Sequence, residues 1–370
     1  MTHLNALIPS DDLASALKAR HVTRKQHPHL PLSIYTYAPV CQYENLWNDV
    51  TMRCRGLVVD DDSGRIVALP FPKIFVTTMH NHGLPFAPPL PAEPFEILEK
   101  ADGSLAIVFH YRGKWHAASK GSFISGQAQW AQAVLDSSDT SRLDPSLTYL
   151  AEAIYPDNRI VIDYGSRKDL VLLAAFRPAD LGEMPLEVAG GHWAPIGPTV
   201  STWGLSDSVE ALEQLAAANT TVDGDLVSGT AAEGYVIRFA SGLRAKVKLA
   251  DYLQIHALFT GTNERTVWEV LAAGNDPADL FDQVPDEFRD WAHRVADKMR
   301  AQVSDWIAKA TVAYQEIGHL NGRKEFALRA VNSPYRAALF HLYDGRDITA
   351  LAWKEARPRG DASPYKTDEA

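Results

Sequence analysis

The chain has 370 residues, of which 46% are hydrophobic and 22% charged, and its formal net charge is −10 at pH 7. This composition is ordinary for a soluble globular protein of one or two domains. No apolar run approaches the roughly 18 residues that a membrane span needs, and the N-terminus has no basic-then-apolar signal pattern. The two cysteines, Cys41 and Cys54, are too few for a disulfide framework and favour a reducing, cytoplasmic setting. The acidic balance argues against nonspecific coating of nucleic acid, although a local basic groove is compatible with it.

The first 250 residues consist mainly of strand-like runs separated by turns. Residues 55–69 hold two apolar runs around Asp-Asp-Ser-Gly, which predicts a β-hairpin. Residues 233–249 predict a second hairpin, which turns at Ala-Ser-Gly. Further strands are predicted between these hairpins at 105–119, 147–155, 159–164 and 170–176.

After about residue 250 the pattern changes from strands to helices. From Pro285 to Ile317, apolar residues recur every three or four positions, which predicts one long amphipathic helix. Two shorter helices are predicted after residue 333. The predicted fold class is therefore α+β, with a domain of antiparallel sheets and helices at 1–250 and an all-helical C-terminal domain at 251–370.

Five charged residues occur in an order that suggests chemistry. Lys100 stands two residues before an Asp-Gly turn that opens onto an apolar strand, and Glu152 and Glu233 follow on later strands. Lys246 and Lys248 lie two apart on a strand, so both side chains can point into one pocket. Taken singly, each of these residues is also compatible with a solvated turn or strand face. Their combination is what indicates a site.

This combination resembles that of the covalent nucleotidyltransferase superfamily, which implies nucleotidyl transfer, and elementary chemistry supports the resemblance. A lysine attacks phosphorus only as the free amine, so its pKa of about 10.4 must be lowered. Lys246 and Lys248 are neighbouring cations that would lower it. Glu152 and Glu233 in the same pocket would hold a divalent metal, directly or through water. Metal and lysines would together neutralise a triphosphate during in-line displacement.

The order of the motifs resembles that of the covalent nucleotidyltransferase superfamily of ligases and capping enzymes. The stretches "RCRGLVVD", "PFPKIF" and "SKGS", together with the helical C-terminus, are most similar to the RNA ligase 1 family, of which the T4 phage enzyme is the type member. The resemblance covers about residues 35–250, and beyond them it rests on length and helical character. It implies a nucleotidyltransferase (adenylation) domain, followed by a helical domain that selects the RNA substrate.

The resemblance also implies roles for individual residues. Lys100 would become the AMP-lysine, with Lys246 and Lys248 as catalytic partners. Tyr37 matches a phosphate-contacting tyrosine of the family, although Tyr35 and Tyr43 are close alternatives. The implied ATP-binding residues are Tyr37, Arg55, Lys73, Asp102, Gly103, Lys120, Glu152 and Glu233. The implied cofactors are ATP and Mg²⁺ or Mn²⁺.

The activity implied is that of an ATP-dependent RNA ligase, which joins 5′-phosphate and 3′-hydroxyl RNA ends through lysyl-AMP and adenylylated RNA. The resemblance suggests a monomeric enzyme of RNA repair, with nicked tRNA among its candidate substrates, in a bacterial or phage-infected cytoplasm. One alternative is a ligase or nucleotidyltransferase for other DNA or RNA ends; those families usually carry a β-barrel after the Lys-x-Lys strand, where this chain is helical. The other alternative is a non-catalytic RNA-binding relative, which predicts the loss of a motif residue.

Three other features have competing interpretations. The "HNH" at 80–82 could belong to a metal site, but without a second histidine cluster a loop with exposed imidazoles is the better prediction. Cys54 beside Arg55 could be a reactive thiol, although a small packed residue fits better. A set of basic residues near the C-terminus could bind phosphate or simply be solvated: Arg323, Lys324, Arg329 and Arg336.

Overall fold

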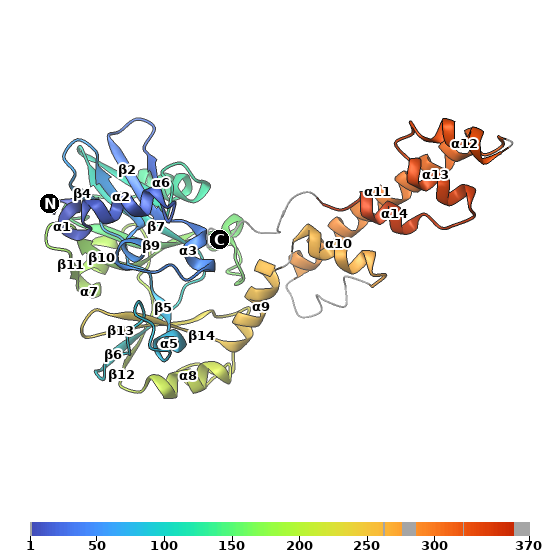
Figure 1. The fold of residues 1–370 in the computed structure, drawn as a ribbon. Coiled ribbons are helices and arrows are strands. Elements are labelled where there is room, and N and C mark those ends of the chain that lie inside the picture. Colours follow the sequence, from blue (N-terminus) through green and yellow to red (C-terminus); the bar gives the residue numbers. More distant parts are fainter. Residues whose placement is uncertain (1, 262, 276–285, 321, 359–370) are drawn as a thin grey trace. The chain divides into compact units, whose positions relative to one another are not determined.

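The computed structural model of the chain describes residues 2–261, 263–275, 286–320 and 322–358 (Figure 1). Contacts within the chain divide it into two units, one ending at Gln254 and the other beginning at Ile255. The first unit combines three sheets with helices, whereas the described residues of the second form only helices. The predicted α+β fold class is therefore confirmed.

The first sheet is antiparallel and has the order β1-β2-β3-β4. Its last two strands are the hairpin predicted at 55–69. The strands are β1 (Val22–Gln26), β2 (Leu32–Tyr37), β3 (Arg55–Asp60) and β4 (Ile66–Ala68). Four short helices accompany them: α1 (Leu4–Leu7), α2 (Ser10–Lys18), α3 (Pro39–Tyr43) and α4 (Asp49–Arg53).

The second sheet is also antiparallel and has the order β11-β10-β9-β7-β8. Its strands are β7 (Ser104–Tyr111), β8 (Lys114–Ser119), β9 (Thr148–Ile154), β10 (Asp169–Arg177) and β11 (Gly182–Met184). One face packs on the first sheet, since Ile34 and Val58 share an apolar cluster with Ile107 and Leu150. The other face is covered by α6 (Gly126–Ser137) and α7 (Leu186–Trp193). Burial between the two sheets forms the main core of this unit.

The third sheet has the order β12-β6-β13-β14-β5 and contains the second predicted hairpin, β13–β14. All its pairs are antiparallel except β14–β5. The strands are β5 (Phe75–Val76), β6 (Phe95–Glu99), β12 (Thr202–Ser206), β13 (Gly234–Phe239) and β14 (Arg244–Lys248). Helices α5 (Thr77–His80) and α8 (Val209–Ala217) belong to the same region.

The strand predicted at 159–164 does not form. A 3₁₀ turn at Pro156–Asn158 ends β9, and residues 159–164 adopt no regular structure. The apolar alternation is nonetheless meaningful, because Val161 and Ile162 are buried. Their backbone N–H groups donate to the Asp102 carboxylate and not to a neighbouring strand. A side-chain acceptor thus replaces the sheet ladder that the sequence pattern suggested.

The second unit is built around a long helix, as predicted. Helix α11 spans Asp286–Ile317, and α9 (Ala250–Gly261) crosses the division between the units. The remaining helices are α10 (Glu264–Ala272), α12 (Arg323–Ala330), α13 (Arg336–Tyr343) and α14 (Thr349–Glu355). Apolar residues of α11 pack against α10 and, further along, against α13. Within the part of the chain that the structure describes, every helix is too short or too polar to cross a membrane.

Candidate active site

Lys100 and Glu233 meet because their strands are paired. Lys100 follows β6 directly, and its backbone N–H donates to the carbonyl of Gly234 at the start of β13, at 2.9 Å. The Lys100 Nζ lies 2.7 Å from the Glu233 Oε2. The Glu233 side chain is buried at 3% exposed, and the Lys100 side chain is largely buried at 13% exposed. The structure therefore brings the predicted nucleophile to one of the two predicted glutamates.

A second lysine contacts the same carboxylate. The Lys248 Nζ lies 2.9 Å from the Glu233 Oε1, and β13–β14 pairing places Gly234 opposite Lys248. Gly234 has a φ of +135°, and a Cβ there would lie 2.2 Å from the Val247 carbonyl oxygen, so only glycine permits this approach. Lys246 is two residues from Lys248 on β14 and shares its face.

The Glu233 carboxylate changes the electrostatic interpretation of this site. A carboxylate beside a lysine stabilises the ammonium form, whereas nucleophilic attack requires the free amine. The sequence-based explanation considered only the cations Lys246 and Lys248 as neighbours of Lys100. In this structure Lys100 is one half of a largely buried ion pair, so attack by its amine would require that this pair be broken or rebalanced.

Asp102 is buried and fully engaged in hydrogen bonds. Its Oδ2 accepts from the backbone N–H groups of Val161 and Ile162, at 2.9 and 2.8 Å. Its Oδ1 accepts from the Tyr252 hydroxyl at 2.9 Å. Burial, followed by the negative charge of Glu233, raises the pKa of Asp102 to about 6. Asp102 therefore ties the turn after Lys100 to segments that follow β9 and β14.

Gly103 connects the same turn to Glu152. Its backbone N–H donates to the Glu152 Oε1 at 3.1 Å. A Cβ at Gly103 would lie 2.6 Å from the Ala153 carbonyl oxygen, so the close approach of the turn to β9 requires glycine. The pairing of β7 with β9, which sets Leu105 opposite Glu152, holds this arrangement. Both predicted glutamates therefore contact the Lys100–Gly103 segment.

A second group of predicted residues surrounds Tyr37. The Lys73 Nζ lies 5.4 Å from the centre of the Tyr37 ring and 4.7 Å from that of Trp47. The Lys120 Nζ lies 5.5 Å from the Tyr37 ring. Two ammonium groups thus approach one aromatic ring, whose face attracts cations. This concentration of positive charge suits an anionic group such as a phosphate.

Arg55 lies beside this group at the start of β3. It is opposite Thr36, the residue before Tyr37. The next residue, Gly56, has a φ of +96°, and a Cβ there would lie 3.1 Å from the Lys120 carbonyl oxygen. The Arg55 Nη1 is buried and finds no hydrogen-bond partner among the described residues. A buried donor without a partner is costly, which fits a place for an acceptor from a bound nucleotide.

A metal site made of protein ligands alone is not preformed. Within the described residues, no three His, Cys, Asp or Glu side chains are grouped so as to hold a metal ion. Both oxygens of Glu233 already contact lysine ammonium groups. Glu152 supplies a second carboxylate, whose Oε1 accepts the hydrogen bond from Gly103, and Mg²⁺ commonly takes its other oxygens from substrate phosphates and water.

Several residues around the site carry no motif in the sequence. Tyr252 contacts Asp102, Tyr164 accepts a hydrogen bond from the Asp102 backbone N–H at 3.0 Å, and Trp47 packs over Lys73. Aromatic residues are common in any core, so no spacing rule singles them out. Tyr164 lies at the end of the segment 159–164, which was wrongly predicted as a strand. The apolar alternation of that segment, which correctly indicates burial, is the one sequence feature that points to Tyr164.

Two side predictions have different outcomes. His80 is not an exposed loop residue: it is buried in α5, and its Nδ1 lies 2.7 Å from the Pro88 carbonyl oxygen. The prediction of two exposed imidazoles is therefore wrong for His80. Cys54 is buried as expected, just before β3, and burial raises the pKa of its thiol to about 12. A reactive thiolate at Cys54 is thus disfavoured.

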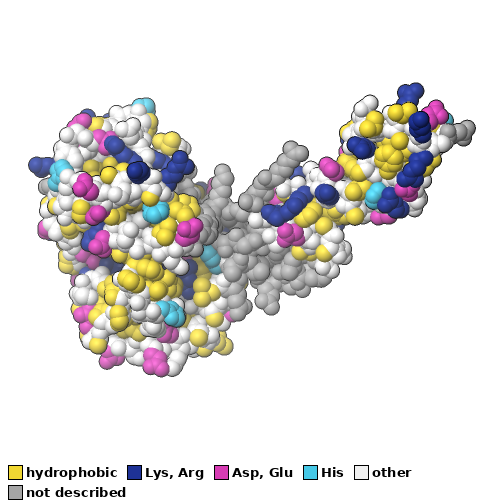
Figure 2. All heavy atoms as spheres, in the orientation of Figure 1, with side chains coloured by type: hydrophobic (Ala, Val, Ile, Leu, Met, Phe, Trp, Pro, Cys, Tyr) yellow, Lys and Arg dark blue, Asp and Glu magenta, His cyan; other side chains and the backbone are white. Residues whose placement is uncertain are grey.

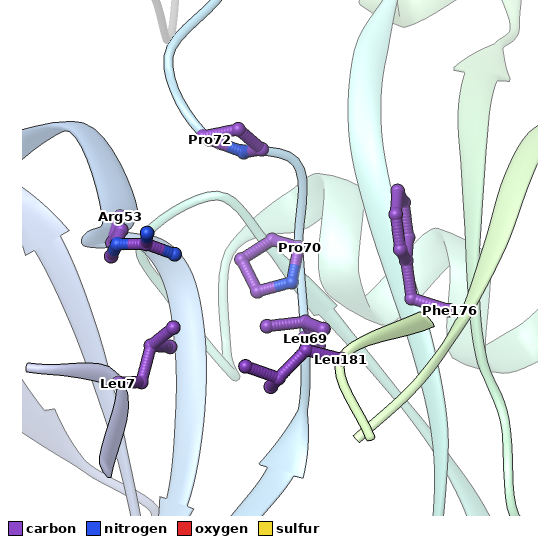
Figure 3. A pocket seen from close by; sticks show the side chains of 7 residues that line it. All are labelled: Leu7, Arg53, Leu69, Pro70, Pro72, Phe176 and Leu181. Carbon is purple, nitrogen blue, oxygen red and sulfur yellow. The ribbon is translucent and has the colours of Figure 1, made fainter. Parts of the chain in front are cut away.

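A pocket elsewhere in the first unit has a different character (Figure 3). Figure 3 shows Arg53 as the single charged side chain among apolar ones. The lining residues are Leu7, Arg53, Leu69, Pro70, Pro72, Phe176 and Leu181. A triphosphate needs several donors and cations, so the nucleotide fits the lysine-rich residues described above better than this pocket.

Comparison with known proteins identifies the family of this chain. A family model described as RNA ligase, of the T4 RNA ligase 1 type, matches residues 53–254, which is more than half of the chain. The chain therefore belongs to this RNA ligase family. A putative bifunctional polynucleotide kinase/RNA ligase of Autographa californica nuclear polyhedrosis virus is 27% identical over 162 residues, covering 37% of this chain and 23% of that protein. The chain thus matches about a quarter of the length of this relative.

Solved structures with partial likeness include other ligases. An RNA ligase of Naegleria gruberi, solved with ATP and Mn, is 14% identical with a TM-score of 0.36, over 45% of this chain and 52% of that one. A putative ATP-dependent DNA ligase from Aquifex aeolicus is 15% identical with a TM-score of 0.46, over 90% and 98%. An archaeal ATP-dependent RNA ligase is 15% identical with a TM-score of 0.46, over 93% and 98%.

Proposed function

We propose that this chain is an ATP-dependent RNA ligase that works through a lysyl-AMP intermediate on Lys100. The observation that carries the proposal is the buried Lys100–Glu233–Lys248 arrangement, in a chain that belongs to the RNA ligase family. Burying two ammonium groups and a carboxylate is unfavourable unless they pair closely, and such groups cluster where chemistry is done.

In the proposed first step, the Lys100 Nζ attacks the α-phosphorus of ATP. A nitrogen–phosphorus bond forms, the bond to the bridging oxygen of the β-phosphate breaks, and pyrophosphate leaves with the electron pair. The proton that the Lys100 ammonium must lose passes to Glu233, whose Oε2 is 2.7 Å away, within reach for a general base. Lys248 then remains beside Glu233 and keeps positive charge near the departing phosphates.

The proposed triphosphate contacts come from the group around Tyr37. Arg55, Lys73 and Lys120 supply donors and positive charge, and the buried Arg55 Nη1 gains the acceptor that it lacks among the described residues. Glu152 would hold a divalent cation, Mg²⁺ or Mn²⁺, together with phosphate oxygens. When bound, that cation would supply additional charge neutralisation at the phosphates.

In the two later steps, AMP moves from Lys100 to a 5′-phosphate RNA end, and a 3′-hydroxyl then displaces AMP. We assign RNA selection to the helical unit. Lys324, Arg329 and Arg336 are exposed and form no ion pair with other described residues, whereas Arg323 pairs with Asp344 at 2.7 Å. Figure 2 shows Lys and Arg side chains gathered over the α12 to α14 end of this unit. Such a surface favours phosphate contact.

The test is to incubate the purified chain with α-labelled ATP or GTP and Mg²⁺, and then with 5′-phosphorylated RNA or DNA. We expect an acid-sensitive adduct from ATP on the peptide that contains Lys100, followed by adenylylated RNA and joined RNA. Faster joining of nicked tRNA than of a plain oligonucleotide would indicate a role in RNA repair. A GTP adduct, or joining of DNA alone, would favour a different nucleotidyltransferase. Absence of any adduct would favour a non-catalytic RNA-binding relative.

A further inference from the structure

Residues 159–164 hold the turn that follows Lys100 through hydrogen bonds to both the side chain and the backbone of Asp102. The Asp102 carboxylate accepts two backbone N–H groups, from Val161 and Ile162. In return, the Asp102 backbone N–H donates to the Tyr164 hydroxyl oxygen at 3.0 Å. The exchange resembles a reciprocal cap, in which each segment satisfies polar groups of the other.

Tyr164 is well placed to hold this contact. Its ring packs on a buried apolar cluster that contains Ala101, the residue between Lys100 and Asp102. The Arg167 guanidinium lies over the ring at 5.5 Å. Burial raises the pKa of Tyr164, so the hydroxyl stays a neutral phenol at neutral pH. Packing and hydrogen bonding therefore fix the same side chain.

The backbone around Lys100 is consequently held at two points. On one side, the Lys100 N–H donates to the Gly234 carbonyl at 2.9 Å. On the other side, two residues later, the Asp102 N–H is held by Tyr164. A short segment anchored at both ends leaves the lysine side chain little freedom to drift from the Glu233 carboxylate.

We propose that Tyr164 is a positioning residue, which orients Lys100 for attack on the nucleotide. The inference rests on the proposed function, because it assigns Tyr164 to the step in which Lys100 is the nucleophile. A displacement of about 1 Å in a reacting group can reduce a rate about a hundredfold. Removing the Tyr164 hydroxyl therefore slows lysine adenylylation far more than it weakens ATP binding.

The last step of ligation provides an internal comparison. When RNA is supplied already adenylylated, the 3′-hydroxyl attacks the activated end and Lys100 is not needed as a nucleophile. A defect in positioning Lys100 leaves that reaction intact, whereas general damage to the fold slows both reactions. The ratio of the two rates thus separates positioning from stability.

The experiment uses the full chain with Tyr164→Phe, which deletes one oxygen and keeps the ring. The single-turnover rate of lysyl-AMP formation is measured over a range of ATP concentrations. We expect the maximal rate to fall by about ten- to a hundredfold, the half-saturating ATP concentration to change less than about threefold, and sealing of pre-adenylylated RNA to stay within about threefold.

Tyr149→Phe is the matched control. The Tyr149 hydroxyl also accepts a backbone N–H, that of Asp144 at 2.9 Å, and its ring is buried against Trp193. This variant loses the same kind of bond, together with the contact of the Tyr149 hydroxyl with the His192 Nδ1 at 3.0 Å, without touching the turn after Lys100. Melting temperatures of both variants show how far each is destabilised.

Equal slowing of adenylylation in the two variants would overturn the inference. So would equal slowing of adenylylation and sealing in Tyr164→Phe, or an unchanged rate in that variant. Failure of the proposed function would appear instead in the wild-type chain, as the absence of a lysyl adduct.

Discussion

The candidate site of the first unit and the surface of the helical unit place their charged side chains in opposite environments. In the first unit, Lys100, Lys248 and Glu233 are 13%, 12% and 3% exposed, and both lysines contact the Glu233 carboxylate directly. In the helical unit, the pair Lys309–Asp305 is typical, with both side chains 60% exposed. Exposed pairs of this kind contribute about 0–1 kcal/mol each to stability.

This difference indicates where each unit can act. Buried charges are expensive to desolvate, so the Lys100–Glu233–Lys248 arrangement is tolerated only because the charges pair closely, and removing one partner is strongly unfavourable. Exposed charges on the helical unit can exchange water for phosphate at little cost. We therefore expect chemistry to depend sharply on single residues in the first unit, and RNA affinity to depend gradually on several residues in the second.

The sharpest test of this comparison is Lys100. Lys100→Ala removes the nucleophile, so the labelled adduct should fall below detection. The melting temperature should fall only modestly, because Lys248 still pairs with Glu233. Lys100→Arg should fail as well, because a guanidinium with a pKa above about 12 cannot supply a neutral nucleophile. A variant that is still labelled on the same peptide would refute the assignment. Retained sealing of pre-adenylylated RNA by either variant would confirm that the protein is folded.

The next effect in size is expected at Glu233. Glu233→Gln keeps the shape of the side chain but cannot take the Lys100 proton, so adenylylation should slow by about 10²- to 10³-fold. Glu233→Ala should lose activity and stability together, because two buried ammonium groups lose their partner.

Glu183 offers a matched control for Glu233. Its carboxylate also bridges two cations in the first unit, Arg238 at 3.1 Å and Arg244 at 2.6 Å. Glu183→Gln should reduce stability without a specific loss of adenylylation per folded molecule. If both variants slowed adenylylation equally, buried pairs would matter only for folding and the contrast between the units would weaken.

The pH dependence of stability tests the buried turn. The pKa of Asp102 is about 6 in the folded state, against an ordinary value of 3.8. The folded chain thus holds the proton more tightly, and stability from this group is present below pH 3.8 and lost as pH rises through 6. The loss is about 3 kcal/mol, from about two pKa units at 1.36 kcal/mol each.

Asp102→Asn should remove that dependence. The free energy of unfolding in urea, measured from about pH 4 to pH 7, should fall less steeply for the variant than for the wild type. Parallel curves for the two proteins would show that Asp102 does not titrate in this range.

The smallest effect is expected on the helical unit. Replacing three of its basic residues that form no ion pair with other described residues should weaken RNA binding by about tenfold at low salt. The slope of log K against log salt concentration should become shallower by about two, because each of three lost phosphate contacts contributes about 0.7. Lysyl-AMP formation should be unchanged. The variant combines Lys324→Ala, Arg329→Ala and Arg336→Ala. The control combines alanine substitutions at the ion-paired residues Lys298, Arg300 and Lys309. Equal weakening by both would mean that total charge, and not this surface, attracts RNA.

The sequence predicted the regular parts of the fold well and the irregular parts poorly. Both hairpins and the long helix α11 follow from local hydrophobic periodicity, which the structure confirms. The strand prediction for 159–164 was wrong because the apolar alternation matches a strand. The N–H groups of Val161 and Ile162 instead donate to the side chain of Asp102, 59 and 60 residues earlier in the chain. The prediction of an exposed imidazole at His80 was wrong for a similar reason, since its burial involves a contact with the Pro88 carbonyl that no local pattern encodes.

What the sequence determined by itself was the identity of the chemical groups. The order from Lys100 through Glu152 and Glu233 to Lys248 resembles that of nucleotidyltransferases, and each of these residues lies on a strand or directly beside one. Only the tertiary structure decided which groups touch. Strand pairing between β6, β13 and β14 sets one glutamate between two lysines, and a loop after β9 brings Tyr164 to the turn after Lys100. Contacts such as Lys100–Glu233, 133 positions apart, and Asp102–Tyr164, 62 positions apart, depend on how distant segments pair, and local sequence patterns do not specify that pairing.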